Sequence, residues 1–376
     1  MSILKSRLVQ GLVVTVVLGL SPAAAQEVIN IGLAQSVTGG SPALYGIEQK
    51  NAAELVVDEA NAAQLLGNKK LRLIHLDDGA DRGQTVNIFQ RLIGREKVVA
   101  IIGPTLSTGA FAADPIAQKA GVTVIAASNT ASGITEIGDH IFRVSPPEDR
   151  VTPGVLKTVI DRFKIRRVAQ IYGIDDQLTK SAYNVQKKVL EGLGVEIVAT
   201  ETFQRGDVEF SAQLTKIKAA KPDLIVLGSL AEESAGILRQ ARQLGIPNEV
   251  KFVGTQSSIS SKFFELAGPA AEGLIAGTAW YIDSPEPKNV EFVKQYEARF
   301  GRKPDIYSAY GHDAAALLVQ AIKDAGSTDR KAIRDALAKI KTYPGVLGPI
   351  GFDEGREPLI TPKILVAADG RFKLFK

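Results

Sequence analysis

The chain has 376 residues, of which 45% are hydrophobic, and this length predicts two domains with a substantial core. Of its 45 basic side chains, two (Lys5 and Arg7) lie in an amino-terminal segment without acidic residues, so 43 basic and 41 acidic side chains remain beyond it. This near-neutral balance, without a basic stripe carrying interleaved aromatics, excludes nucleic acid as an expected partner. Cysteine is absent, which excludes disulfides and cysteine metal ligands.

Residues 1–25 have the order of a secretory signal peptide. Lys5 and Arg7 precede an uncharged apolar run at 8–20, and small residues lead to Ala25. The run is shorter than the about 20 residues that a membrane-spanning helix needs. We therefore predict cleavage after Ala25, with an uncleaved signal anchor as the alternative. Because no cysteine is available for a lipid anchor, the predicted product is free in the periplasm.

The chain after the signal alternates β-rich runs with amphipathic helical stretches. The expected strands are 28–34, 71–76, 98–102 and 122–127, and the expected helices run from Ser41-Pro42 to about 67, over 81–94 and from about 107 to 120. Ser41 is expected to be the N-cap of the first helix, followed by proline at N1. Strands that alternate with helices of this length predict βα units and a parallel sheet.

The alternation restarts after paired prolines within 141–150. Strands are expected at 168–173, 195–200, 223–229 and 250–254. The run 272–281 follows, then helices over 292–301, 308–322 and 329–340 and strand-like ends at 363–369 and 371–376. Ten or more strands would strain one open sheet, so we expect a second sheet. Extended crossings near 143–146, 273–277 and 347–351 would form a hinge beside a cleft, which the loops after the strands would line.

The sequence offers no familiar catalytic or metal-binding motif. His75, His140 and His312 form no H-E-x-x-H pair, and the phosphate-loop, dinucleotide and nucleophile-elbow patterns are missing. A dispersed Ser-His-Asp triad stays open, because geometry rather than sequence order defines it. The pair Asp77-Asp78 after a strand is more typical of a turn and helix cap than of a metal site. We expect no enzyme, no metal and no cofactor.

Three long motifs resemble one family of transport proteins. "DVEFSAQLTKIKAAKPDLIVLGS" (207–229), "LRQARQLGI" (238–246) and "YSAYGHDAAALL" (307–318) resemble the leucine/isoleucine/valine-binding proteins of ABC transporters, which are type I periplasmic solute-binding proteins. The resemblance covers essentially all of the mature chain. It implies an α/β fold of two Rossmann-like lobes with parallel sheets joined by a three-stranded hinge. It also implies a monomer that closes on a small ligand without chemical change and presents it to ABC permease membrane subunits.

The predicted lobes each combine distant segments of the chain. Residues 26–144 and 276–349 would form the N-terminal lobe. Residues 145–275 and 350–376 would form the C-terminal lobe.

The resemblance places ligand-binding residues in three loops of the first lobe. Tyr45 would stack on the ligand or cover it, and its alternative is packing on its own lobe. Ser107 would hold the ligand carboxylate together with Thr108, at a predicted helix start where free N–H groups favour an anion; the alternative is an ordinary N-cap. Ser128 and Thr130 would complete the carboxylate clamp, or form only a polar turn.

The second lobe departs from the amino-acid-binding pattern. Leu178 and Ala231 stand near points where the family often has an aromatic or a tyrosine. Gln256 replaces the acidic side chain that pairs with the ammonium group of an amino acid. Glu232 or Glu233 could compensate, but carboxylates at a helix start are more often solvated caps.

The glutamine at this position has an energetic consequence for the ligand. Breaking a buried ion pair costs roughly 3–5 kcal/mol, or about two to three orders of magnitude in affinity. The sequence therefore predicts a carboxylate without an α-ammonium group: an aromatic acid, a 2-oxo acid or a short aliphatic acid. A branched-chain amino acid is the alternative ligand, and a periplasmic ligand sensor of the same fold is the alternative function.

Overall fold

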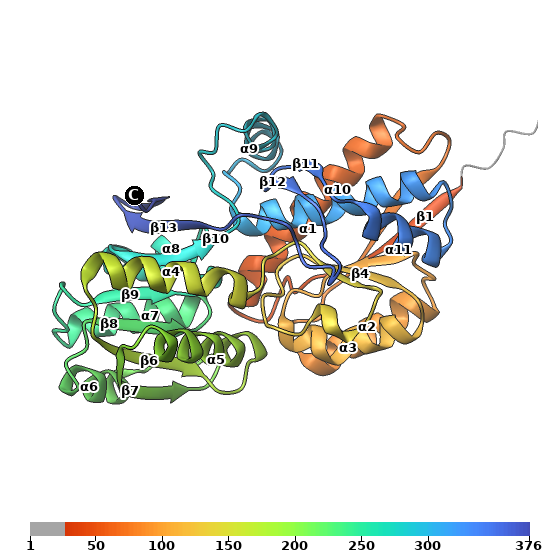
Figure 1. Cartoon of the computed structure of the whole chain (residues 1–376). Coiled ribbons are helices and arrows are strands. Elements are labelled where there is room, and N and C mark those ends of the chain that lie inside the picture. Colours follow the sequence, from red (N-terminus) through yellow and green to blue (C-terminus); the bar gives the residue numbers. More distant parts are fainter. Residues whose placement is uncertain (1–26) are drawn as a thin grey trace, which may run out of the picture.

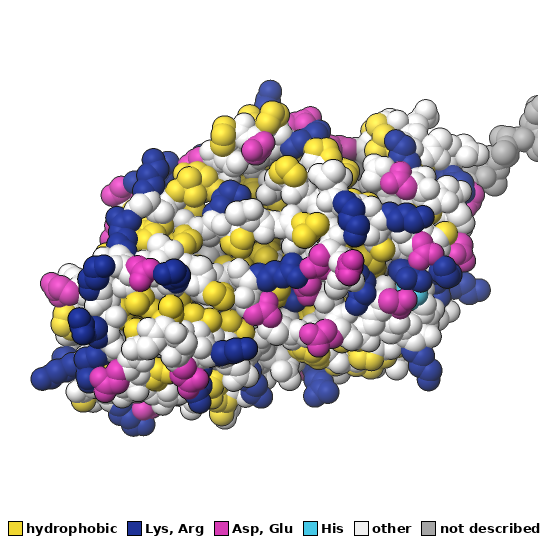
Figure 2. Space-filling view, viewed as in Figure 1, with side chains coloured by type: hydrophobic (Ala, Val, Ile, Leu, Met, Phe, Trp, Pro, Cys, Tyr) yellow, Lys and Arg dark blue, Asp and Glu magenta, His cyan; other side chains and the backbone are white. Residues whose placement is uncertain are grey.

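A computed structural model describes residues 27–376, which form two α/β lobes (Figure 1). The predicted signal peptide lies outside the described residues. Within residues 27–376, no helix combines the length and the hydrophobicity that crossing a bilayer requires. The face shown in Figure 2 carries basic and acidic side chains interspersed, without a field of one sign, as the nearly neutral composition leads one to expect.

The first lobe is built on a five-stranded parallel sheet in the order β2-β1-β3-β4-β5. Its strands are β1 (Val28–Ala34), β2 (Lys70–Leu76), β3 (Ala100–Ile102), β4 (Thr123–Ala126) and β5 (Ile141–Arg143), and the helices α1 (Pro42–Ala62), α2 (Arg82–Gly94) and α3 (Ser107–Lys119) follow the first three strands. The prediction of parallel βα units is confirmed. Because β1, β3 and β4 are parallel and adjacent in the sheet, their carboxyl ends share one edge, and the loops that follow these strands meet there.

The second lobe is built on a seven-stranded sheet in the order β14-β13-β10-β9-β8-β6-β7. Its strands are β6 (Arg167–Gly173), β7 (Glu196–Phe203), β8 (Leu224–Gly228), β9 (Lys251–Gly254), β10 (Leu274–Thr278), β13 (Lys363–Ala368) and β14 (Arg371–Leu374), and its helices are α4 (Glu148–Phe163), α5 (Gln177–Gly192), α6 (Ser211–Ala219), α7 (Ala231–Gln243) and α8 (Phe263–Ala267). Strands β6 to β10 pair in parallel, whereas β13 and β14 add an antiparallel edge.

Three further helices and a short hairpin return to the first lobe. They are α9 (Pro287–Phe300), α10 (Ile306–Ala325), α11 (Arg330–Lys339), β11 (Tyr343–Gly345) and β12 (Gly348–Ile350). The buried Glu48 of α1 joins them, because its carboxylate accepts hydrogen bonds from Tyr296 of α9 and Ser308 of α10 and pairs with Arg302.

The chain passes between the two sheets three times: after β5, after β10 and after β12. The predicted crossing near 273–277 was wrong, because β10 pairs with β9 on one side and β13 on the other. It is therefore a strand of the second sheet, and the chain crosses after Thr278. The third crossing, predicted near 347–351, follows β12 and runs over residues 351–362. The division of the chain into lobes at 144, 275 and 349 remains a prediction.

The loops of the first lobe hold Asp77 and Asp78 in a turn, as the sequence suggested. Asp77 accepts hydrogen bonds from the Val37 and Gly79 N–H groups, and Asp78 accepts one from the Ser36 hydroxyl. The cap of α2 is instead Asp81, whose side chain accepts from the N–H of Gln84.

Candidate functional site

The loops at the carboxyl ends of the strands bring the two lobes into contact. Several hydrogen bonds cross between them; among these, the N–H of Ala231 donates to the Tyr45 hydroxyl (2.9 Å), the Thr108 hydroxyl donates to Asp176 Oδ2 (2.8 Å), and the N–H of Ser132 donates to Ser181 Oγ (2.9 Å). Each of these three bonds joins a segment around the first sheet to a helix of the second lobe. The structure therefore has the lobes closed on one another.

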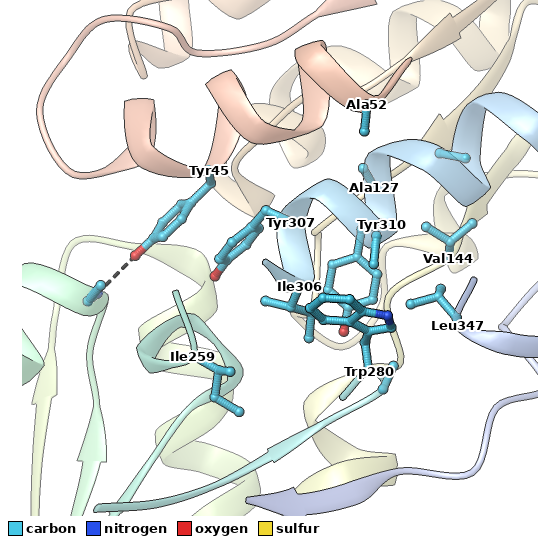
Figure 3. Close-up of a cluster of buried hydrophobic side chains, with 14 of the residues drawn as sticks. Tyr45, Ala52, Ala127, Val144, Ile259, Trp280, Ile306, Tyr307, Tyr310 and Leu347 are labelled. Carbon is cyan, nitrogen blue, oxygen red and sulfur yellow. Dashed lines mark hydrogen bonds between the residues drawn. The ribbon is translucent and has the colours of Figure 1, made fainter. Parts of the chain in front are cut away.

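Tyr45 lies at the centre of this contact, in the first turns of α1. Its ring stacks on Tyr307 of α10 with 4.3 Å between centroids, and its hydroxyl reaches Ala231 across the cleft (Figure 3). Burial raises the pKa of the Tyr45 phenol. The next residue, Gly46, approaches the backbone of Ser36 so closely that a Cβ would collide with it. A glycine is thus needed for α1 to place Tyr45 beside the loop after β1.

The loop after β3 places Ser107 and Thr108 at the start of α3. Leu106, not Ser107, occupies the N-cap position, and the Ser107 hydroxyl accepts a 3.4 Å hydrogen bond from the N–H of Ala131. The alternative of an ordinary serine N-cap is therefore wrong. The Thr108 hydroxyl is committed to the second lobe, since it also accepts from the N–H of Gln177 (3.0 Å). The first N–H groups of α3 have no intrahelical acceptor and remain available to an anion.

The loop after β4 contributes Ser128 and Thr130. The Ser128 hydroxyl donates to the Thr105 carbonyl (2.9 Å) and accepts from Gln49 Nε2 (2.6 Å), so it is engaged within the first lobe. Thr130 is buried, but its hydroxyl has no hydrogen-bond partner among the described residues.

Three further buried oxygens near the cleft have no hydrogen-bond partner within residues 27–376: Ser41 Oγ, Gln49 Oε1 and Glu233 Oε2. Ser41 stands at the N-cap position of α1 and proline follows at N1, as predicted, but the Ser41 side chain makes no capping hydrogen bond. Buried polar groups are nearly always hydrogen-bonded. Unpartnered groups at the junction of two lobes therefore point to a polar ligand that would complete them.

The second lobe supplies an apolar wall and Gln256. Leu178 and Ala231 are buried in the same apolar cluster as Tyr45. Gln256 Oε1 accepts from the Tyr310 hydroxyl (2.9 Å), and its Nε2 donates to the Pro146 carbonyl (3.0 Å). Both ends of the Gln256 amide are therefore used inside the protein.

Glu148, which the sequence analysis did not single out, lies beside Gln256. It is the first residue of α4 and only 2% exposed, and its Oε1 is 3.5 Å from Gln256 Nε2. Its N–H donates to the Thr130 carbonyl (3.0 Å), and its Oε2 accepts from the Thr152 hydroxyl (3.1 Å). Burial raises the pKa of Glu148, and the nearby Thr130 hydroxyl opposes this shift. The two groups are not placed closely enough, or at a suitable angle, for a hydrogen bond. The sequence feature that could have identified Glu148 is its place directly after the first crossing between the lobes.

The paired glutamates at the start of α7 differ from one another. Glu232 is exposed, as predicted for a solvated cap, but Glu233 is 3% exposed and its Oε1 accepts from the N–H of Gly206 (3.0 Å). The interpretation of Glu233 as a solvated cap was therefore wrong. Desolvation raises the pKa of Glu233.

Two of the three histidines contact neighbouring groups in the part of the chain that the structure describes. His75, on the edge strand β2, contacts the Gln35 carbonyl. His312 bonds Asp313 and packs on Phe292. Residues 27–376 contain no group of three or more histidine, aspartate or glutamate side chains placed to hold a metal ion.

The geometry can be compared with that of known proteins. A sequence model of the family described as "Periplasmic binding protein" matches residues 28–371. The leucine-, isoleucine-, valine-, threonine- and alanine-binding protein of Pseudomonas aeruginosa is 28% identical over 331 residues, which cover 88% of this chain and 87% of that protein.

Two solved structures show the same fold along nearly the whole chain. The branched-chain amino acid transporter substrate-binding protein LivJ of Streptococcus pneumoniae, in complex with isoleucine, has a TM-score of 0.86 and 28% identity, covering 92% of this chain and 98% of its own. An ABC-transporter solute-binding protein of Rhodopseudomonas palustris BisB5, in complex with 3,4-dihydroxybenzoic acid, has a TM-score of 0.83 and 26% identity, covering 92% and 95%. The chain therefore belongs to the leucine/isoleucine/valine-binding-protein family, the type I periplasmic solute-binding proteins of ABC transporters.

Proposed function

We propose that this protein works in the periplasm, where it binds a small carboxylate without an α-ammonium group between its lobes and delivers it to an ABC permease. An aromatic acid, a 2-oxo acid or a short aliphatic acid would meet this description. The observation that carries the proposal is the state of Gln256. Its carbonyl oxygen already accepts from Tyr310 and its amide nitrogen donates to Pro146, so it offers an ammonium group no charge and only an acceptor that is already shared.

The two buried glutamates suit the same ligand class when they carry a proton. Glu148 and Glu233 both have pKa values raised by desolvation, which favours their neutral forms. A neutral carboxyl group provides no counter-charge for a buried ammonium. It can instead donate a hydrogen bond to a ligand oxygen.

The first lobe supplies donors that suit a carboxylate. The N–H groups at the start of α3, together with the hydroxyls of Ser107 and Thr130, would contact the ligand oxygens. Tyr45, Leu178 and Ala231 would cover its apolar body. The complex of the Rhodopseudomonas palustris relative with 3,4-dihydroxybenzoic acid shows that a protein of this fold holds an aromatic acid.

A branched-chain amino acid is the second candidate, and the position of Glu148 favours it. This carboxyl group adjoins both Thr130 and Gln256, so in its ionised form it could take the ammonium that Gln256 cannot. The relatives from Pseudomonas aeruginosa and Streptococcus pneumoniae bind such amino acids.

Isothermal titration of the mature protein with matched ligands would decide between the two. Leucine and 4-methyl-2-oxopentanoate share the same carbon chain and differ at the α-position, while benzoate and 3,4-dihydroxybenzoate test the aromatic acids. We expect at least one acid without an ammonium group to bind more tightly than leucine. Tight leucine binding without a response to the other acids would overturn the proposal.

Two further measurements test the transport role. Deletion of the gene should abolish uptake of the bound acid, whereas a sensor would leave uptake capacity intact and change a signalling response. Light scattering after gel filtration should give the mass of a monomer.

A further inference from the structure

Arg143 is the largest fully buried side chain of the described residues, with 1% of its surface exposed. It ends β5, at the point where the chain first leaves the first lobe. Burying a guanidinium is unfavourable unless its donors are satisfied and its charge is paired. The partners of Arg143 therefore indicate what the buried charge does.

Four hydrogen bonds hold the Arg143 guanidinium. Nη1 donates to the carbonyls of Asn129 (2.9 Å) and Ala131 (2.6 Å), and Nε and Nη2 each donate to one carboxylate oxygen of Glu357 (both 2.6 Å). The carbonyl between these two, that of Thr130, accepts from the N–H of Glu148. Three successive carbonyls of the loop after β4 are thus held by donors.

Because the peptide bond is planar, holding these carbonyls also fixes the directions of the N–H groups in the same peptides. In a trans peptide the C=O and N–H point in opposite directions. The peptide joining Thr130 to Ala131 shows the result, because its C=O meets Glu148 while its N–H donates to Ser107. The peptide joining Asn129 to Thr130 has its C=O on Arg143, so the Thr130 N–H points away from Arg143. This N–H has no acceptor among the hydrogen bonds of the described residues, and neither has the Thr130 hydroxyl.

We propose that Arg143 is a positioning residue for the carboxylate site: by holding the Asn129 and Ala131 carbonyls it aims the Thr130 N–H at the ligand, and Glu357 fixes the guanidinium that does so. The inference rests on the proposed function, in which a carboxylate lies at Thr130.

Glu357 belongs to the third crossing between the lobes, which gives the arrangement a link to the hinge. Its N–H donates to Asp353 (2.9 Å), and Asp353 pairs with Arg150 of α4 (2.5 Å). Glu357 also accepts from the Thr135 hydroxyl (2.7 Å). The third crossing is therefore bonded directly to the side chain that holds the carbonyls of the loop after β4.

The test compares each acid with the amide of its carboxyl group in Arg143→Lys. Benzoate with benzamide and leucine with leucinamide are titrated calorimetrically into wild type and variant, and the pair whose acid binds wild type is the probe. A lysine cannot hold both carbonyls and Glu357 in the same fork. We expect affinity for the acid to fall about 10- to 100-fold, whereas affinity for the amide changes little. Equal weakening of acid and amide would show a structural role only and would overturn the inference.

Two other variants keep the test decisive if the lysine variant does not fold. Thr135→Val removes a hydroxyl that bonds Glu357 but not the loop, and should keep the wild-type preference for acid over amide. Glu357→Gln leaves the arginine without its ion pair, and positioning predicts weaker acid binding. Stronger acid binding in Glu357→Gln would mean that Arg143 acts by its charge and would contradict positioning. The proposed ligand class fails separately, if wild type binds leucine tightly and does not respond to any of the acids without an ammonium group.

Discussion

Substitution of Thr108 by valine should shorten the lifetime of the closed complex for every ligand. The Thr108 hydroxyl lies in the first lobe and makes two bonds to the second, donating to Asp176 at 2.8 Å and accepting from the N–H of Gln177 at 3.0 Å. Both bonds require the lobes to be closed. Valine has the same shape as threonine but can make neither bond.

The magnitude follows from the types of bond that are lost. A hydrogen bond to a charged group contributes about 1.5–3 kcal/mol and a neutral one about 0.5–1.5 kcal/mol. Gln177 is exposed, and Asp176 keeps its capping bonds from the N–H groups of Leu178 and Thr179, so the loss falls below the sum. We expect about 1.4–2.8 kcal/mol, which is a 10- to 100-fold loss of affinity.

Stopped-flow fluorescence separates the two rate constants. Trp280 is the sole tryptophan of the chain and lies buried just after β10, at the second crossing, so its emission should report closure. Because the bonds form after the ligand enters, the dissociation rate constant should rise while the association rate constant stays unchanged. Thr108→Ser retains the hydroxyl and serves as the control.

Two results would refute this reasoning. A slower association with unchanged dissociation would place the two bonds on the entry pathway. A factor that differs between an acid and the amide of its carboxyl group would mean that Thr108 contacts the ligand carboxylate, as the sequence analysis predicted.

Three other variants have distinct expected outcomes. Gln256→Glu adds a carboxylate where the family binds an ammonium, so calorimetry should show leucine gaining about tenfold or more relative to 4-methyl-2-oxopentanoate; no relative gain would contradict the assignment. Glu148→Gln should stabilise the protein at neutral pH. Because burial raises the pKa of Glu148, the contribution of this residue to wild-type stability is fully present below the ordinary glutamate pKa of about 4.3. That contribution is lost as the pH rises through the raised value. Thermal unfolding across this range should show the two proteins converging in acid, and a constant difference would refute the assignment. Tyr45→Phe leaves the N–H of Ala231 without its acceptor in the closed form, so affinity should fall a few-fold while the ligand-free melting temperature stays unchanged; an equal loss of stability would point to a packing role alone.

Much of the fold could be predicted from the sequence, because it depends on local patterns. Alternating β-rich and amphipathic runs placed the strands of both sheets, and turn residues marked the loops that follow them. Ser107 and Thr130 could be assigned to the facing loops for the same reason, since strand ends in a parallel sheet share an edge. The error at β10 arose because an extended segment reads the same in sequence whether it joins a sheet or crosses between lobes.

Only the tertiary structure decided how these groups are paired. Glu148 and Glu233 look like solvated helix starts in the sequence, yet both are buried where the lobes meet. The partner of Thr108 is Asp176, and that of Arg143 is Glu357, each far along the chain and on a segment of or leading to the other lobe. The sequence by itself determined which secondary-structure elements form and where their loops lie. Burial, pairing and charge state at the cleft depend on the closure of two lobes built from distant segments, which no local pattern encodes.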